Sequence, residues 1–247
     1  STLGSLGLAL GIDYGLEPSH MGANLPSVDL GTGRIAVEIA AHGNSYYSCA
    51  LLDDSSVKCW GYGYYGYQGY GDKAYRGTFL NTQSQMGDNL PAVDLGSGFT
   101  PAHLRGTQHG PCVISTTGTL KCWGEGFYGT RGYEDTEDRG DEPCEMGDKL
   151  PVVNLGAGLV AVDIAGGYFT SCVVFSTQQM KCFGGSSSTL GYGDWVDRQS
   201  PLGDSLPFID LNSADGAGAS AVYAANYHVC VVLTTSEMKC WGQGQGT

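Results

Sequence analysis

Eight of the nine cysteines fall into four pairs with a single spacing, and this repeat restricts the fold more than any other feature of the chain. The second cysteine of each pair follows the first by ten residues and always stands in the sequence Lys-Cys-aromatic-Gly. A Leu-Pro dipeptide precedes each pair, at positions 25, 90, 150 and 206. Such internal repetition predicts one repeat domain over residues 1–247, with approximate units 1–60, 61–123, 124–183 and 184–247. The cysteine pairs are Cys49 and Cys59, Cys112 and Cys122, Cys172 and Cys182, and Cys230 and Cys240.

Each unit contains short segments with the pattern of β-strands. Residues 36–40 alternate apolar and polar side chains, which predicts a short half-buried strand. Residues 48–52 and 57–60 flank a short polar turn and predict a hairpin. With a three-residue turn, Leu51 lies opposite Val57 and Cys49 lies opposite Cys59. The last residue of such a turn usually has left-handed backbone, which suits Gly118 in the second unit; the other units have Ser55, Gln178 and Ser236 there.

The opposed cysteines predict four disulfides. Directly opposite residues of a hairpin have Cβ atoms about 4.5–5.5 Å apart, and closer in non-hydrogen-bonded pairs, which approaches disulfide geometry. Four local bridges indicate an oxidising compartment, so we expect a secreted or cell-surface protein. The alternative is four pairs of packed free thiols in a cytosolic protein. Zinc is excluded because the chain has no Cys-x-x-Cys knuckle.

Cys144 is the cysteine left over. It stands in the polar segment Glu142-Pro143-Cys144-Glu145, outside the repeated pairs. An odd cysteine in a secreted protein is either a free thiol or the partner of a thiol in another chain, and both alternatives stay open here.

The segment from Ile39 to Asp72, IAAHGNSYYSCALLDDSSVKCWGYGYYGYQGYGD, resembles the regulator-of-chromosome-condensation repeat. The shared marks are a strand ending in Cys-Ala-Leu-Leu, a strand ending in Trp-Gly and a Gly-Tyr-Gly-Asp loop, found at residues 69–72 and 191–194. The resemblance covers all 247 residues. It implies an all-β chain of β-propeller-type blades, usually seven with four strands each, and the cysteine pairs are similar to those of a secreted branch found in algae and other protists.

The chain departs from that family in its number of units. It has four, and its first residues around Leu6–Gly11 resemble the loop that follows Trp241-Gly242 at its other end. We favour a piece of something longer. Three arrangements stay open: a four-unit ring, part of a longer propeller, or one chain continued by the next in a ring or filament.

Composition and charge exclude several functions. The net charge is −13 and the chain lacks a basic face, so we expect no nucleic-acid partner. No apolar run approaches the roughly 20 residues that span a bilayer, so we expect no membrane insertion. The nucleotide-exchange activity known in the family rests on particular loops, for which this chain has no matching segment.

Motifs for cofactors and catalysis are weak. Two Gly-x-Gly-x-x-Gly stretches follow Trp-Gly, but they lack the strand–helix context of a dinucleotide site. The acidic run at residues 133–142, with Asp53, Asp54 and Asp72, is a candidate for Ca²⁺, although EF-hand spacing is absent and solvated loop carboxylates are the favoured interpretation. The five histidines are scattered and no nucleophile motif occurs. We therefore expect no cofactor and no enzyme activity.

Aromatic residues crowd the glycine-rich loops after Trp-Gly. Exposed aromatic side chains are good contact anchors, whereas packing against a neighbouring blade is the structural alternative, and the two are equally supported. The candidates for partner contact are Tyr62, Tyr64, Tyr65, Tyr67, Tyr70, Phe127 and Tyr128.

These observations favour a non-enzymatic extracellular structural or interaction module, such as a repeated subunit of a cell-surface or filamentous assembly. Its expected partners are other proteins or further copies of itself. The alternative function is a lectin-like or inhibitor-like propeller that binds a glycan or a protein through its tyrosine-rich loops. Fold alone does not decide between them.

Overall fold

The computed structural model describes residues 4–8, 12–42, 46–78, 85–185, 188–212 and 216–244. These residues form four antiparallel three-stranded units that follow one another along the chain. These residues also form seven short 3-10 turns, of which two precede the first strand and five lie between strands. The strands are β1 (Ala36–Ala41), β2 (Tyr47–Leu52), β3 (Val57–Gly61), β4 (Pro101–Thr107), β5 (Gly110–Ser115), β6 (Leu120–Cys122), β7 (Ala161–Gly166), β8 (Thr170–Phe175), β9 (Met180–Gly184), β10 (Ala219–Ala224), β11 (His228–Leu233) and β12 (Met238–Gly242). The turns are η1 (Pro18–His20), η2 (Gly22–Asn24), η3 (Gly87–Asn89), η4 (Phe127–Gly129), η5 (Gly147–Lys149), η6 (Ser188–Leu190) and η7 (Gly203–Ser205).

The predicted hairpin register is confirmed in every unit. Leu51 lies opposite Val57 and Cys49 opposite Cys59, and the other units repeat this pairing. The last turn residue has a positive φ in all four hairpins, including the three where it is not glycine. All four disulfides form across the hairpins, with Cα atoms 4.1 Å apart.

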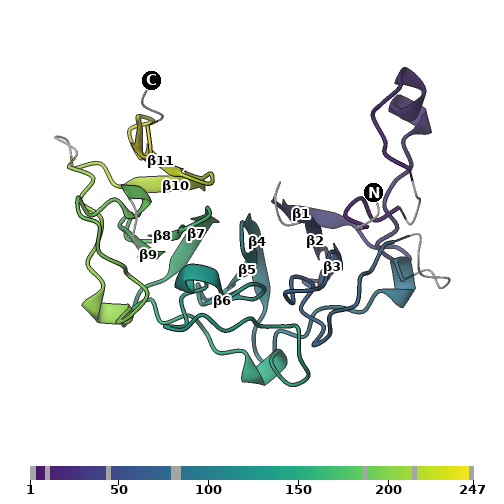
Figure 1. The fold of residues 1–247 in the computed structure, drawn as a ribbon, viewed down its shortest axis with the longest axis horizontal. Helices are drawn as coiled ribbons and strands as arrows, with labels where there is room; N and C mark the ends of the chain where they lie inside the picture. The colour runs from purple at the N-terminus through teal and green to yellow at the C-terminus, as the bar shows by residue number, and fades with distance from the viewer. Residues whose placement is uncertain are drawn as a thin grey trace.

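The four units are arranged as an open arc. Figure 1 shows their first strands, β1, β4, β7 and β10, on the inner side of the arc, with β1 and β10 flanking its open side. A parallel bridge between Thr107 and Gly166 joins the two middle units into one six-stranded sheet. This arrangement is that of propeller-type blades, so the predicted all-β fold class is confirmed.

The apolar core lies between adjacent units. In the first interface, Cys49, Leu51 and Cys59 of one blade pack in the same cluster as Leu104 and Val113 of the next. Similar clusters lie at the following interfaces. A blade with apolar side chains on both faces needs a neighbour on each side, so burial depends on the neighbours as much as on the blade itself.

The outer edge of each of the first three blades is completed by the following unit. The resemblance implies four-stranded blades, whereas the sheets described here have three strands. The fourth place is taken by the extended Leu-Pro segment of the next unit, which contributes one backbone hydrogen bond to the third strand. The bonds run from Val93 N to Val57 O (2.7 Å), Val153 N to Leu120 O (2.8 Å) and Ile209 N to Met180 O (2.9 Å).

The first residues of the chain resemble the loop that follows Trp-Gly in the other units. The Ser5 carbonyl accepts a hydrogen bond from the Trp60 indole, as the Tyr67 carbonyl does from Trp123, so residues 4–8 occupy the place of such a loop. Residues 9–11 and 245–247 of these end segments lie outside the described residues. No helix in the described ranges is long and apolar enough to cross a membrane. The boundaries of the units stay a prediction.

Candidate interaction surface

The lysine of each Lys-Cys-aromatic-Gly motif has a structural role. In the first unit the Lys58 ammonium donates to the carbonyls of Leu30 (2.9 Å) and Gly87 (2.8 Å), which belong to successive units. Lys121 and Lys181 make the equivalent contacts, and burial lowers the pKa of both ammonium groups. A buried charge needs such hydrogen-bond partners, so this lysine joins adjacent units and is not a binding residue. Its recurrence in all four motifs was the signal in the sequence.

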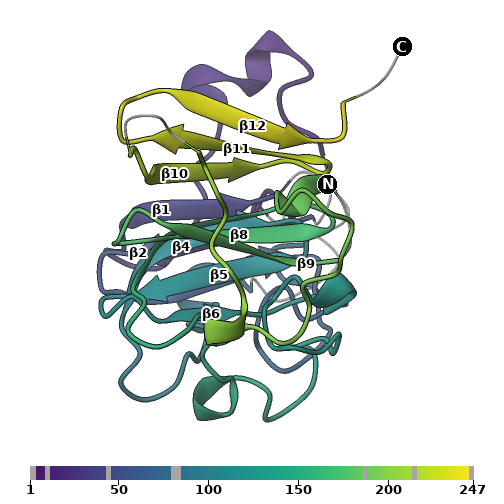
Figure 2. The same cartoon turned by 90° about the vertical axis from the view of Figure 1, so that its left-hand side faces the viewer.

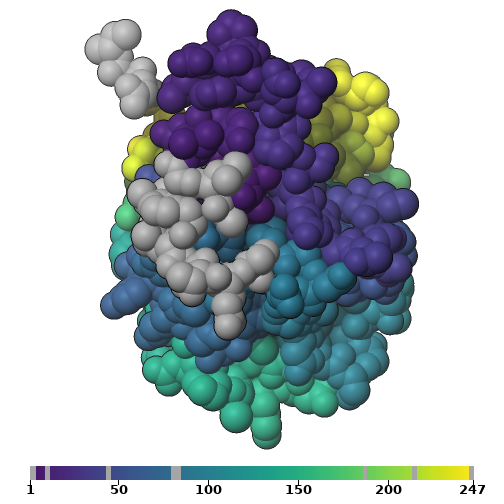
Figure 3. Space-filling view, turned by 90° about the vertical axis from the view of Figure 1, so that its right-hand side faces the viewer, coloured from purple at the N-terminus to yellow at the C-terminus, as the bar shows by residue number. Residues whose placement is uncertain are grey.

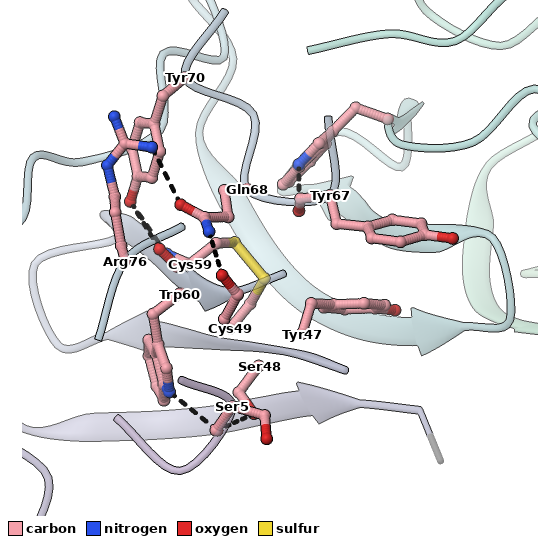
Figure 4. The surroundings of a disulfide bond; sticks show 12 residues. Ser5, Tyr47, Ser48, Cys49, Cys59, Trp60, Tyr67, Gln68, Tyr70 and Arg76 are labelled. Atoms are coloured by element: carbon pink, nitrogen blue, oxygen red, sulfur yellow. Dashed lines mark hydrogen bonds between the residues drawn. A yellow bond between two sulfur atoms is a disulfide. The ribbon is translucent and has the colours of Figure 1, made fainter. Parts of the chain in front are cut away.

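Tyr70 holds the edge of the disulfide hairpin. Its hydroxyl accepts from the Cys59 N–H and donates to the Cys59 carbonyl, both at 3.1 Å. The Arg76 guanidinium stacks over the ring at 4.3 Å (Figure 4). It also pairs with Asp72 at 2.8 Å. Residues 133–139 and 192–198 repeat this Tyr-x-Asp-x-x-x-Arg clamp on the second and third disulfide hairpins.

Two of the predicted contact residues, Tyr70 and Tyr67, have structural contacts instead. Tyr70 is a structural residue, because its hydroxyl satisfies backbone groups of the strand. Tyr67 is only 4 % exposed and its ring stacks on Tyr47, with centroids 5.3 Å apart. Figure 4 shows these two rings stacked one over the other, and their planes are inclined by 27°. Sequence alone could not separate these core tyrosines from their exposed neighbours, because all of them stand in one glycine-rich loop.

The other predicted aromatics gather where two loops of each unit meet. The residue after Trp-Gly donates its N–H to the carbonyl of an aromatic residue in the loop between the first two strands, as Tyr62 does to Tyr46 (3.0 Å) and Glu125 to His109 (2.8 Å). The last two units repeat this bond. We call the resulting group of partly exposed rings the aromatic loop surface: Tyr62, Tyr64, Tyr65, Tyr75, Phe127, Tyr128, Tyr168, Phe169 and Tyr227.

The rings of this surface contact one another within two groups. In the group that follows the first disulfide hairpin, Tyr62 lies 5.1 Å from Tyr75 and 6.3 Å from Tyr64, measured between centroids. In the second group, which spans three units, Tyr128 packs on Phe169 at 4.7 Å. Tyr128 has a φ of +57°, which is uncommon for a bulky residue. Sequence reasoning missed Tyr168, Phe169 and Tyr227, which belong to a different loop from the predicted residues.

Glu125 and His109 connect the two groups. Glu125 accepts from the Tyr67 hydroxyl (3.0 Å) and contacts His109 Nδ1 (2.8 Å), while His109 Nε2 contacts the Tyr168 carbonyl (2.7 Å). Both ring nitrogens of the buried His109 therefore lie within hydrogen-bond distance of an oxygen atom. The hydrogen bond from His109 is the main cause that lowers the pKa of Glu125.

A second polar group lines the inner side of the arc. Arg105 reaches Glu38 of the first blade (3.1 Å) and Asp163 of the third (2.8 Å), and His103 contacts Glu38 (2.9 Å). These contacts lower the pKa of Glu38 despite its partial burial, so its carboxylate is an ion-pair partner and not a raised-pKa acid. The group holds three blades together and contains no nucleophile paired with a base.

The candidate Ca²⁺ ligands have other roles. Asp72 pairs with Arg76, and Asp54 accepts hydrogen bonds from Ser56 and pairs with Arg34. No cluster of three or more metal-binding side chains occurs in the part of the chain that the structure describes. Cys144 is exposed and forms none of the four intrachain disulfides.

The fold and this surface together define a class of protein: an all-β, propeller-type repeat protein whose ordered loops present aromatic rings. No family model matches the chain, and no curated protein matches it. Several solved structures are similar to the chain. Human WBSCR16 has a TM-score of 0.62 and 16% sequence identity, over 84% of this chain and 47% of that one.

Two structures of yeast RCC1 are also similar. Prp20 bound to Kap60 has a TM-score of 0.61 and 17% identity, covering 85% of this chain and 44% of that one. Prp20p from Saccharomyces cerevisiae, described with its binding properties to Gsp1p and histones, has a TM-score of 0.59 and 19% identity, over 85% and 46%. These similarities establish an RCC1-like propeller fold for the chain, which spans less than half the length of the structures it matches.

Proposed function

We propose that the chain is a non-enzymatic extracellular interaction module, in which stapled blades present the aromatic loop surface to a protein partner. The observation that carries the proposal is the grouping of partly exposed rings from all four units on loops tied by the same backbone hydrogen bond. Rings held in place lose little entropy on binding, and tyrosine offers both apolar area and a hydroxyl. The yeast neighbour described with protein partners adds support for a protein ligand.

Extracellular placement is supported by the four disulfides, because such bridges persist in oxidising compartments. A structural role, as a repeated subunit of a cell-surface or filamentous assembly, is part of the same proposal. A thiol count on the denatured, unreduced protein tests the placement. We expect one reactive thiol per chain, from Cys144, and more than one would contradict it.

The partner proposal is tested by capturing proteins from the extracellular fraction of the source organism. We compare the wild-type chain with the double variant Tyr64→Ala/Phe127→Ala, since both side chains are exposed within the surface. Tyr223→Ala is the matched control, because Tyr223 is also an exposed aromatic residue but lies on β10 at the inner side of the arc. The double variant should bind about tenfold more weakly or worse. Equal capture by all three chains would overturn the role of the surface.

A glycan ligand is the second candidate, since sugars stack on exposed rings as proteins do. A glycan array with the same three chains separates the two. Binding to defined sugars that the double variant loses would replace the protein partner by a glycan.

A further inference from the structure

The three internal junctions between units are built from the same set of contacts. Each junction has the strand-edge bond from the Leu-Pro segment. In addition, a lysine of one unit donates to the carbonyl of a glycine in the next unit, and the N–H of the same glycine donates to a carbonyl of the preceding unit. At the first junction these are Lys58 to Gly87 (2.8 Å) and Gly87 to Asp29 O (3.0 Å). Gly147 and Gly203 repeat both contacts at the next two junctions.

The fourth blade presents one half of this junction without the other. Met238 is 67 % exposed, whereas Met180, at the same place in the third blade, is 0 % exposed. Cys240 is exposed too, although its three counterparts are buried. Within the described ranges, Lys239 donates to the carbonyls of Leu211 and Asn212, which both belong to its own unit. We call this surface the tail face: Asp210, Asn212, Met238, Lys239 and Cys240.

The first unit presents the other half. Ile39 is 77 % exposed, whereas its counterpart Leu104 is 1 % exposed; Met21 is 51 % exposed and its counterpart Met86 is 4 % exposed. Residues 12–25 project from the body of the arc in Figure 1 and form a knob on the surface in Figure 3. We call this surface the head face: Met21, Gly22, Ala23, Leu25, Val28 and Ile39.

Two substitutions at these ends compensate for each other. At each internal junction, a glycine of one unit lies against an aspartate of the next. At the first junction these are Gly31 and Asp88, and a Cβ on Gly31 would lie 2.9 Å from the Asp88 carboxylate. Gly96 with Asp148 and Gly156 with Asp204 are equally close, at 2.7 and 2.8 Å. On the tail face the glycine is replaced by Asn212, which has a Cβ, and on the head face the aspartate is replaced by Ala23. The short Ala23 side chain on the head face leaves room for the Asn212 side chain on the tail face.

We propose that the tail face of one chain binds the head face of a second copy of the same chain. The head segment adds to the β12 edge, with Val28 N–H donating to Met238 O, and Gly22 receives the Lys239 ammonium while donating to Asp210 O. This is strand addition in the geometry already used three times within the chain. Because the two faces differ, the contact is heterologous, so two arcs close into a ring or many form a filament. The inference rests on the structural part of the proposed function, for which it names the partner and the contact, and it involves none of the aromatic loop surface.

The first test is the oligomeric state, measured by light scattering after gel filtration over a wide concentration range. We expect wild type to form dimers or larger assemblies as its concentration rises. Met238→Asp and Ile39→Asp should each stay monomeric, and because both side chains are exposed, neither change should unfold the blade. In a mixture of the two variants, the intact head face of Met238→Asp can bind the intact tail face of Ile39→Asp. Neither chain can bind a third, so the mixture should form dimers and nothing larger. Val196→Asp is the matched control, exposed but outside both faces, and should assemble like wild type.

The second test examines the register. Ala23→Asp should weaken association about tenfold, because the carboxylate meets the Asn212 side chain, and Asn212→Gly in the same chain should restore it to within about threefold. A folded wild-type chain that stays monomeric at every concentration would overturn the proposal. Equal weakening by Ala23→Asp with and without Asn212→Gly would overturn the register. The aromatic variants should assemble normally, so failure here is distinguishable from failure of the partner proposal.

Discussion

The third and fourth units contain almost the same hairpin but differ in what covers it. Met180-Lys181-Cys182-Phe183 and Met238-Lys239-Cys240-Trp241 have the same register and the same cross-strand disulfide geometry. The third hairpin is enclosed by the fourth unit, whereas the outer face of the fourth, at the edge marked by β12 in Figure 2, is exposed. The comparison teaches that local chemistry sets the shape of a blade, while its neighbours set its burial.

The largest difference should come from the methionines. Met180→Ala removes a buried side chain and should cost about 2–4 kcal/mol of unfolding free energy, because a cavity remains. Met238→Ala should change stability by no more than about 0.5 kcal/mol. Denaturant unfolding of both variants, at a concentration where the chain is monomeric, provides the measurement. Similar costs would contradict the difference in burial.

The disulfides should respond alike. Each bridge closes a loop of the same length, so replacing both cysteines by alanine should cost about 2–3 kcal/mol in either unit, on the loop-entropy model. Thermal unfolding of Cys172→Ala/Cys182→Ala and Cys230→Ala/Cys240→Ala checks this. A much smaller effect in the fourth unit would show that the bridge depends on burial.

The tyrosine clamp should have an intermediate effect. Tyr192→Phe leaves the Cys182 N–H and carbonyl without the hydroxyl that bonds both, which should cost about 1–2 kcal/mol. Tyr223→Phe is the control, since its side chain is mainly exposed, and it should unfold like wild type. Hydrogen exchange at the Cys182 amide gives a local measure, and unchanged protection in Tyr192→Phe would reject the role of the clamp.

The smallest effect should come from the clamp carboxylates, and it depends on pH. The hydrogen bond from Arg139 lowers the pKa of Asp135 in the folded chain. Its stabilisation is therefore complete above the unfolded pKa of about 4 and is lost as the pH falls through the lower folded value. Asp135→Asn should remove part of this acid sensitivity, with an effect below about 1 kcal/mol after solvent screening. The measurement is the unfolding free energy of wild type and variant as a function of pH. An equal loss of stability in both chains at acidic pH would contradict this prediction.

The hairpins and their bridges could be predicted because they are local. Cys49 and Cys59 are ten residues apart. The turn between them allows one register in which Cys49 faces Cys59 and Leu51 faces Val57. The repetition in four units multiplied this signal.

The contacts between units could not be predicted in the same way. Lys58 binds carbonyls 28 and 29 residues away on either side, and only the packing of successive blades brings them together. Whether a loop tyrosine is buried, as Tyr67 is, or exposed, as Tyr64 is, depends on the turn of the loop and not on its composition. The recurrence of Lys and of Tyr-x-Asp-x-x-x-Arg showed that these residues matter, but not what they contact.

The placement of each disulfide within a single hairpin has a consequence for how such a chain can evolve. A recombination event that duplicates or deletes one unit carries both cysteines of a bridge with it, so no partner is lost and no new mispairing is created. Bridges between distant units would make every such event leave orphaned thiols. A gene built from these units can therefore change its number of blades by unequal crossing-over without having to rebuild its pattern of oxidation.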